Sequence, residues 1–165
     1  RQQQRVARTV REVGGTHLLA YWDRLEAAGD FTPVIDDAVA SIAAIEQSFR
    51  CRPHLDLVGY SFGSLVALSV ARRLPVDGVA VISPPLFEYD FAPLLDVRPP
   101  ARVWHAPADP FCPAGALESL GLAGLDIHAF PAADHFFRGA EEALAAAVLS
   151  PWLNRATSPS RGGPA

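Results

Sequence analysis

The chain has few of the features that mark several large classes of protein. Two cysteines among 165 residues, Cys51 and Cys112, cannot form a disulfide framework and are consistent with a reducing compartment, the cytoplasm. No apolar run is long enough to span a membrane, and no signal-peptide pattern opens the chain. The net charge is −4, with no basic block except the N-terminal arginines. Neither a membrane nor a nucleic acid is therefore an expected partner.

The composition is that of a globular protein. Half of the residues are hydrophobic and 19% are charged, and the chain is long enough to bury a core. The last nine residues, TSPSRGGPA, have no apolar periodicity. We predict one domain over residues 1–153 and a disordered tail over residues 154–165.

Strand-like and helix-like segments alternate along the chain. Strands are predicted over residues 16–22, 54–58, 79–83, 102–106 and 125–130. Helices are predicted over residues 5–13, from an N-cap at Thr32 to Phe49, from Ser61 to near Pro75, and over 113–120 and 138–149. This alternation predicts an α/β fold: a three-layer sandwich with a mainly parallel sheet of about five strands. In such sheets the chemistry collects at the carboxyl ends of the strands.

The pentapeptide Gly-Tyr-Ser-Phe-Gly at residues 59–63 lies between an apolar strand-like run and an apolar helix-like run. A serine in that setting sits on a tight strand-to-helix turn, with its hydroxyl open to substrate. We expect glycine at 59 and 63 because a side chain at either position would crowd the turn. The alternative is an ordinary βα unit that happens to carry a serine in its turn.

Two further polar residues follow two other predicted strands. Asp109 comes after the strand at 102–106, and His135 comes after the strand at 125–130. A serine hydroxyl needs a base to become a nucleophile, histidine can take its proton near neutral pH, and a carboxylate holds the imidazole in the right tautomer. Ser61, Asp109 and His135 therefore form a candidate catalytic set.

Other residues could fill some of these places. In isolation Asp109 could be a turn residue and His135 a structural histidine. Asp90 follows the strand at 79–83 and is a competing acid, whereas Asp134 is too close to His135 in sequence to orient it well. The remaining histidines lie in or beside strands and are interpreted as structural: His17, His54, His105 and His128.

These motifs give the chain a resemblance to the α/β-hydrolase superfamily, and within it to the small lidless bacterial hydrolases grouped near dienelactone hydrolase. The resemblance extends over roughly residues 5–153. The matching segments are GYSFG at 59–63, SPPLFEYDF at 83–91, APADPFCP at 106–113 and AADHFF at 132–137.

The resemblance implies a serine hydrolase of small esters or thioesters that works through an acyl-enzyme and uses no cofactor and no metal. Ser61 would be the nucleophile, His135 the base and Asp109 the acid, and the backbone N–H of Phe62 would be one oxyanion donor. Several apolar residues lie near the strand ends and could line a pocket for the substrate. The predicted substrate-binding residues are Tyr60, Leu86 and Phe136.

The chain departs from the superfamily pattern at its N-terminal end. Members usually begin with three strands before the first helix, and the loop after the third strand supplies the second oxyanion donor. No glycine-rich stretch of that kind stands at residues 1–4 or at 23–26. The chain would then be a fragment lacking about fifty residues, or strand 16–22 would pair directly with strand 54–58 in a five-stranded sheet ordered as in sequence.

These departures leave alternatives open. A missing N-terminal segment or a homo-oligomer would provide a partner for the strand at 16–22. The rival function is a non-catalytic, hydrolase-like module used for binding or assembly.

Overall fold

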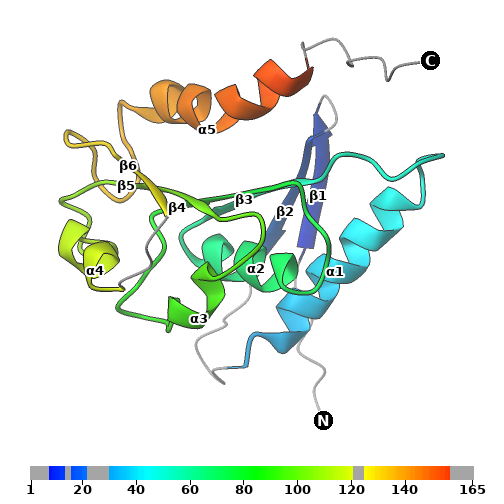
Figure 1. Ribbon diagram of the computed structural model, residues 1–165, viewed down its shortest axis with the longest axis horizontal. Helices are drawn as coiled ribbons and strands as arrows, with labels where there is room; N and C mark the ends of the chain where they lie inside the picture. Colours follow the sequence, from blue (N-terminus) through cyan, green and yellow to red (C-terminus); the bar gives the residue numbers. More distant parts are fainter. Residues whose placement is uncertain (1–7, 14–15, 22–29, 121–124, 157–165) are drawn as a thin grey trace, which may run out of the picture. The chain divides into compact units, whose positions relative to one another are not determined.

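The computed structural model divides into two compact units, Arg1–Pro53 and His54–Ala165, which are considered separately. The residues it describes are 8–13, 16–21, 30–120 and 125–156 (Figure 1). Within these residues, no helix combines the length and apolar character needed to cross a bilayer. The single domain over residues 1–153 stays a prediction. Residues 154–156 of the tail predicted over 154–165 belong to the last helix, Glu141–Ala156, so their predicted disorder is wrong, and residues 157–165 lie outside the described residues.

The first unit begins with two antiparallel strands, β1 (Arg8–Val13) and β2 (Thr16–Tyr21), whose register runs from Arg8 opposite Tyr21 to Val13 opposite Thr16. The helix predicted over residues 5–13 is therefore wrong. Three of the six residues of β1 are Thr or Val, which favour strands, and Gly-Gly between two such runs is a hairpin signal in the sequence. In β1, pairing with β2 stabilises the extended conformation more than the helical spacing of its valines favours a helix.

This pairing also corrects the predicted sheet. Residues 16–21 form a strand as predicted, but their partner in the structure is β1. The hypothesis that this strand pairs with strand 54–58 is wrong, because β2 belongs to a two-stranded sheet with β1, whereas strand 54–58 contributes to a separate four-stranded sheet.

The helix α1 (Thr32–Glu46) follows in the same unit. Its N-cap is Phe31 rather than the predicted Thr32, one residue earlier. The carboxylate of Asp30 accepts a hydrogen bond from the Thr32 N–H at 2.9 Å, which provides the cap that the Thr32 side chain was expected to provide.

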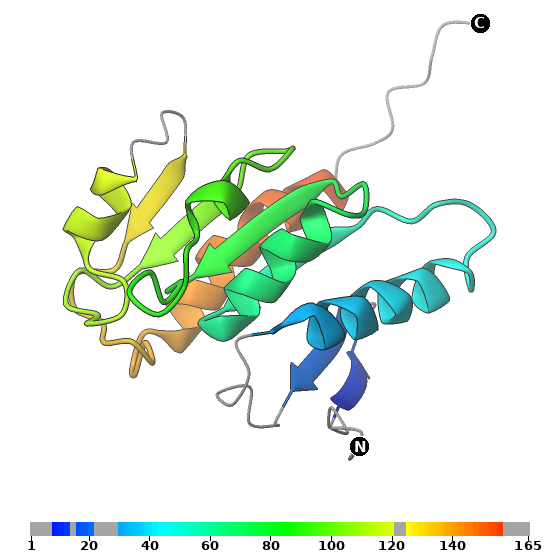
Figure 2. The same ribbon diagram turned by 90° about the horizontal axis from the view of Figure 1, so that it is seen from below.

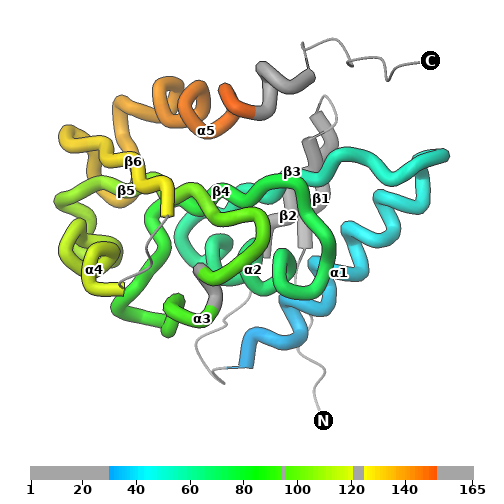
Figure 3. Tube along the Cα trace, viewed as in Figure 1, coloured from blue at the N-terminus to red at the C-terminus, as the bar shows by residue number. Residues whose placement is uncertain are grey.

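The second unit is built on four parallel strands in the order of the sequence. They are β3 (Asp56–Tyr60), β4 (Gly78–Ile82), β5 (Arg102–His105) and β6 (Asp126–Ala129). The helices between and after them are α2 (Phe62–Ala71), α3 (Ala92–Leu95), α4 (Ala114–Ser119) and α5 (Glu141–Ala156). Figure 3 shows the path of the chain through these elements.

Helices cover both faces of this sheet. Figures 1 and 2 show α2 and α3 on one face and α5 on the other. The strand β4 is buried along its whole length, as expected of an apolar strand covered on both sides. On the α5 face the core joins Ile82, Trp104, Phe137 and Val148. The predicted α/β class and three-layer arrangement are confirmed, with four parallel strands in the sheet.

Candidate active site

Ser61 lies on the turn that joins β3 to α2, as the pentapeptide predicts. Its backbone has φ 49° and ψ −122°, a strained left-handed conformation for a residue that is not glycine. The Ser61 N–H donates to the carbonyl of Ile82 at the end of β4, at 2.8 Å. The turn is thus attached to the carboxyl end of the neighbouring strand.

The two glycines of the pentapeptide are not equivalent. A Cβ built on Gly59 would lie 2.3 Å from the carbonyl oxygen of Gly63 and 2.6 Å from Cα of Ser64, closer than any side chain can approach. A Cβ on Gly63 would meet nothing within 4 Å. The prediction that both glycines avoid crowding is therefore confirmed for Gly59 and wrong for Gly63, because only Gly59 faces the returning backbone.

The carboxylate of Asp109 and the imidazole of His135 form a short contact. His135 Nδ1 lies 2.7 Å from Asp109 Oδ2, and the Asp109 side chain is completely buried. The other carboxylate oxygen accepts the Phe111 N–H at 2.8 Å. A buried carboxylate is tolerated only when it is hydrogen-bonded or paired, and both oxygens of Asp109 have partners.

The second nitrogen of the same imidazole reaches Ser61. His135 Nε2 lies 3.2 Å from Ser61 Oγ, within hydrogen-bond distance. The structure thus brings Asp109, His135 and Ser61 from the ends of three strands into one connected row. With Nδ1 donating to the carboxylate, Nε2 is the nitrogen available to accept the serine proton.

The other acids and histidines of the sequence analysis have different partners. Asp90 accepts the Ala92 N–H at 3.1 Å, and Asp134 accepts the N–H groups of Phe136 and Arg138. The other described histidines lie elsewhere: His54 beside Asp56 and Asp77, His128 beside Asp126, and His105 buried at the end of β5. The side chain of His17 lies outside the described residues.

A free thiol near Asp109 is a further candidate nucleophile. Cys112 is completely buried just after Asp109. Burial raises the pKa of this thiol to about 12, and the negative charge of Asp109 adds to the shift. A thiol that stays protonated is a poor nucleophile, so Cys112 does not compete with Ser61.

Aromatic side chains surround the ring of His135. Ring centroids lie 5.0 Å away for Phe111, 5.2 Å for Phe136 and 5.7 Å for Tyr60. The Tyr60 hydroxyl also donates a 2.7 Å hydrogen bond to the backbone carbonyl of His135. This bond could not be predicted from the sequence, because the two residues are 75 positions apart and their spacing does not indicate where a side chain points.

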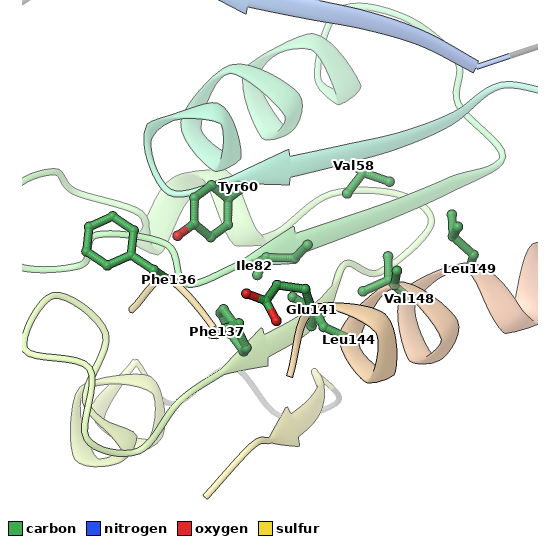
Figure 4. A pocket seen from close by; sticks show the side chains of 10 residues that line it. Val58, Tyr60, Ile82, Phe136, Phe137, Glu141, Leu144, Val148 and Leu149 are labelled. Carbon is green, nitrogen blue, oxygen red and sulfur yellow. The ribbon is translucent and has the colours of Figure 1, made fainter. Parts of the chain in front are cut away.

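An apolar cavity of about 280 Å³ lies beside these residues, between the sheet and α5 (Figure 4). Tyr60 and Phe136 line it, together with Ile82, Phe137 and residues of α5 that include Leu144 and the charged Glu141. Leu86, the third predicted substrate-binding residue, is not among the residues that line it. Its N–H donates to the Phe111 carbonyl at 2.9 Å, in the loop that carries Asp109.

The predicted oxyanion donor, the N–H of Phe62, belongs to the first residue of α2. The N-terminal end of a helix carries partial positive charge. This position suits the stabilisation of an oxyanion beside Ser61.

Solved structures of three bacterial proteins have a similar fold. The first is a candidate α/β hydrolase of unknown function from Agrobacterium tumefaciens, with 23% identity and a TM-score of 0.67 over 88% of this chain and 74% of that one. The second is an α/β serine hydrolase homologue from Coxiella burnetii, with 21% identity and a TM-score of 0.68 over 86% of this chain and 65% of that one. The third is a serine hydrolase without a lid from Xanthomonas campestris, with 25% identity and a TM-score of 0.64 over 84% of this chain and 67% of that one. The chain spans about two thirds to three quarters of their length.

No curated protein is a significant match to the chain. A family model does match it, over residues 16–156, which is well over half of its length. That range includes Ser61, Asp109 and His135. The chain therefore belongs to the dienelactone hydrolase family.

Proposed function

We propose that the protein is a serine hydrolase that cleaves a small ester or thioester through an acyl-enzyme on Ser61. The observation that carries the proposal is the row of contacts from Asp109 to His135, at 2.7 Å, and from His135 to Ser61, at 3.2 Å. The family supports a hydrolytic function. The strained turn that presents the serine supports its role as the nucleophile.

Acylation begins when Ser61 Oγ attacks the carbonyl carbon of the substrate. Nε2 of His135 takes the hydroxyl proton, and the negative charge of Asp109 stabilises the imidazolium that results. The carbonyl oxygen becomes an oxyanion, which the N–H of Phe62 at the N-terminus of α2 stabilises.

The tetrahedral intermediate then collapses. The bond to the alcohol or thiol breaks, and His135 returns the proton to this leaving group. In the second half of the cycle His135 removes a proton from water, which attacks the acyl-enzyme. The bond to Ser61 Oγ then breaks, His135 returns the proton to Oγ, and a carboxylic acid is released. The cycle requires no cofactor and no metal.

The apolar part of the substrate would lie against Tyr60, Phe136 and Leu86. Tyr60 and Phe136 contact the ring of His135 and also line the apolar cavity. Burial of an apolar substituent there would contribute about 25 cal/mol per Å² of area removed from water. We therefore expect esters with an apolar substituent to be preferred over charged ones.

Covalent labelling is the first test of the proposal, because it requires a reactive serine but not rapid turnover.

The test is labelling by a fluorophosphonate probe, with the labelled residue mapped by mass spectrometry. We expect the label on Ser61, loss of labelling in Ser61→Ala, and full labelling in Ser119→Ala, which changes an exposed serine on α4. Hydrolysis of p-nitrophenyl acetate should follow the same pattern. Labelling that persists in Ser61→Ala would contradict the assignment of the nucleophile. Absence of both labelling and hydrolysis in the wild type would favour the rival, a binding module.

A further inference from the structure

We propose that Tyr60 is a positioning residue for His135, acting through the hydrogen bond from its hydroxyl to the His135 backbone carbonyl. This inference rests on the proposed function of Ser61 and His135. It assigns Tyr60 a role beyond lining the substrate site: it would hold the base in line with the nucleophile.

The loop that carries His135 has its own local hydrogen bonds. The Ala133 N–H donates to the Phe130 carbonyl at 3.1 Å, and the Phe137 N–H donates to the Asp134 carbonyl at 3.0 Å. These bonds shape the loop but connect it only to itself. The Tyr60 hydroxyl, by contrast, connects the middle of the loop to the end of β3, 75 residues earlier in the chain.

The residue that makes this connection directly precedes the proposed nucleophile. Ser61 is held by its own N–H on the carbonyl of Ile82, so the backbone around Tyr60 is a fixed reference point. Besides its contact with Ser61, His135 is hydrogen-bonded through its ring to Asp109 at 2.7 Å and through its backbone carbonyl to Tyr60 at 2.7 Å. Together they define where Nε2 lies relative to Ser61 Oγ.

The hydroxyl matters because packing alone does not hold Tyr60. The residue is 41% exposed. Partial burial, followed by the negative charges of Asp109 and Asp134, raises the pKa of the Tyr60 hydroxyl above its usual range. The group therefore stays protonated, and can donate, at any pH at which a histidine would act as a base.

Tyr60 also lines the apolar cavity on the α5 side of the sheet, where Figure 4 shows its ring beside Phe136 and Ile82. Substitution by alanine would therefore remove a cavity wall and a hydrogen bond together. Tyr60→Phe separates the two effects, because the ring stays and only the hydroxyl is lost. Tyr89→Phe is the matched control, since the Tyr89 ring contacts Phe62 and Phe91 rather than His135.

The experiment measures fluorophosphonate labelling rates, and kcat and KM for p-nitrophenyl acetate, in these variants. We expect Tyr60→Phe to reduce the labelling rate and kcat about tenfold, since a displacement of 1 Å in a site can cost about 100-fold. KM and the melting temperature should change little, because the ring remains in place. Tyr89→Phe should keep the wild-type values.

A double-mutant cycle decides whether Tyr60 acts through His135. In a His135→Ala background, with the labelling rate followed over hours, Tyr60→Phe should cause no further loss of that rate, because the group that it positions is absent. An equal loss in both backgrounds would overturn the proposal and indicate direct contact with the reagent. A wild-type rate in Tyr60→Phe would overturn it as well.

The imidazole nitrogen signals of His135 provide a readout that does not depend on activity. In wild-type protein labelled with ¹⁵N-histidine we expect one set of His135 signals, and in Tyr60→Phe shifted or broadened signals. Unchanged signals would contradict the positioning role even if Ser61 proved unreactive. Labelling that persists in Ser61→Ala would instead count against the proposed function alone, so the two failures are distinguishable.

Discussion

The turn that carries Ser61 and the loop that carries His135 meet in one site, but different forces hold them. The turn depends on close backbone packing: Gly59 lies against the carbonyl of Gly63, and the Ser61 N–H bonds to β4. The loop depends on side-chain hydrogen bonds: its own Asp134 accepts the Phe136 N–H, the Tyr60 hydroxyl donates to the His135 carbonyl, and the His135 ring bonds to Asp109. One region is defined by excluded volume and the other by a few polar contacts.

This difference predicts how each region responds to substitution. Overlap with backbone atoms cannot relax through a change of rotamer, so a change at the turn should act on folding itself. A single hydrogen bond contributes about 1 kcal/mol, so changes in the loop should reduce function in small steps while the fold persists. The exception is the contact between the Asp109 carboxylate and the His135 ring, which determines the tautomer of His135.

That exception should give the largest effect on activity. Asp109→Asn keeps an acceptor for the Phe111 N–H but no longer stabilises the imidazolium and favours the wrong tautomer. The same change in a serine-protease triad lowers kcat about 10⁴-fold, and we expect a loss of that order here. The measurement is kcat with an activated ester, beside the melting temperature.

Asp90→Asn is the matched control for this prediction. Asp90 is the competing acid of the sequence analysis, and within the part of the chain that the structure describes its carboxylate accepts only a local N–H, that of Ala92. We expect its kcat to stay within about twofold of the wild type, because Asp90 does not contact His135. A large loss in Asp90→Asn with little loss in Asp109→Asn would reverse the assignment of the acid.

The second prediction tests the packing of the turn. Gly59→Ala would place Cβ 2.3 Å from the Gly63 carbonyl, and we expect a loss of at least about 3 kcal/mol in the free energy of unfolding. Gly63→Ala meets no atom and lies within α2, so it should be neutral or stabilising by about 0.5 kcal/mol. Urea denaturation of both variants measures the difference. Similar stabilities would show that the turn can relax.

Much of this molecule could be predicted from sequence, for physical reasons that particular residues illustrate. The apolar run at β4 has to be buried on both sides, which indicates a central parallel strand. Ser61, Asp109 and His135 each follow a strand, and parallel strands end at the same edge of a sheet. Topology alone therefore predicts that these three residues meet, without any knowledge of their side-chain conformations.

The remainder depends on contacts that spacing does not encode. The valines of β1 have helical spacing, so periodicity alone predicts a helix there, and the pairing with β2 is what makes the segment a strand. The difference between Gly59 and Gly63 depends on which one faces the returning backbone. The bond from Tyr60 to His135 depends on the path of a loop from a distant part of the sequence.

The third prediction concerns the hydrogen bonds that the Asp134 side chain accepts within the loop that carries His135. Asp134 Oδ1 accepts the N–H groups of Phe136 at 3.0 Å and Arg138 at 3.2 Å. Asp134→Ala should cost about 1 kcal/mol of stability, as the loss of a capping side chain does, and reduce kcat a few-fold. Asp134→Asn retains an oxygen acceptor and should behave like the wild type. If the two variants lose activity equally, the charge of Asp134 matters more than its hydrogen bonds.

The smallest effect is expected beneath the site, at His105. Burial lowers the pKa of this buried histidine below 6.5, against weaker opposing effects of a hydrogen bond to the Cys112 backbone and the charges of Asp109 and Glu118. Below about pH 6.5 the unfolded chain therefore binds a proton that the folded chain excludes, and stability falls as the pH falls. His105→Gln removes this group while keeping a side-chain N–H. When the pH is lowered from about 7.5 to about 5, the melting temperature of His105→Gln should fall by a few degrees less than that of the wild type. An identical fall in both proteins would mean that the end of β5 admits the charged imidazole, so that the support beneath Asp109 is less tightly packed than the turn at Gly59.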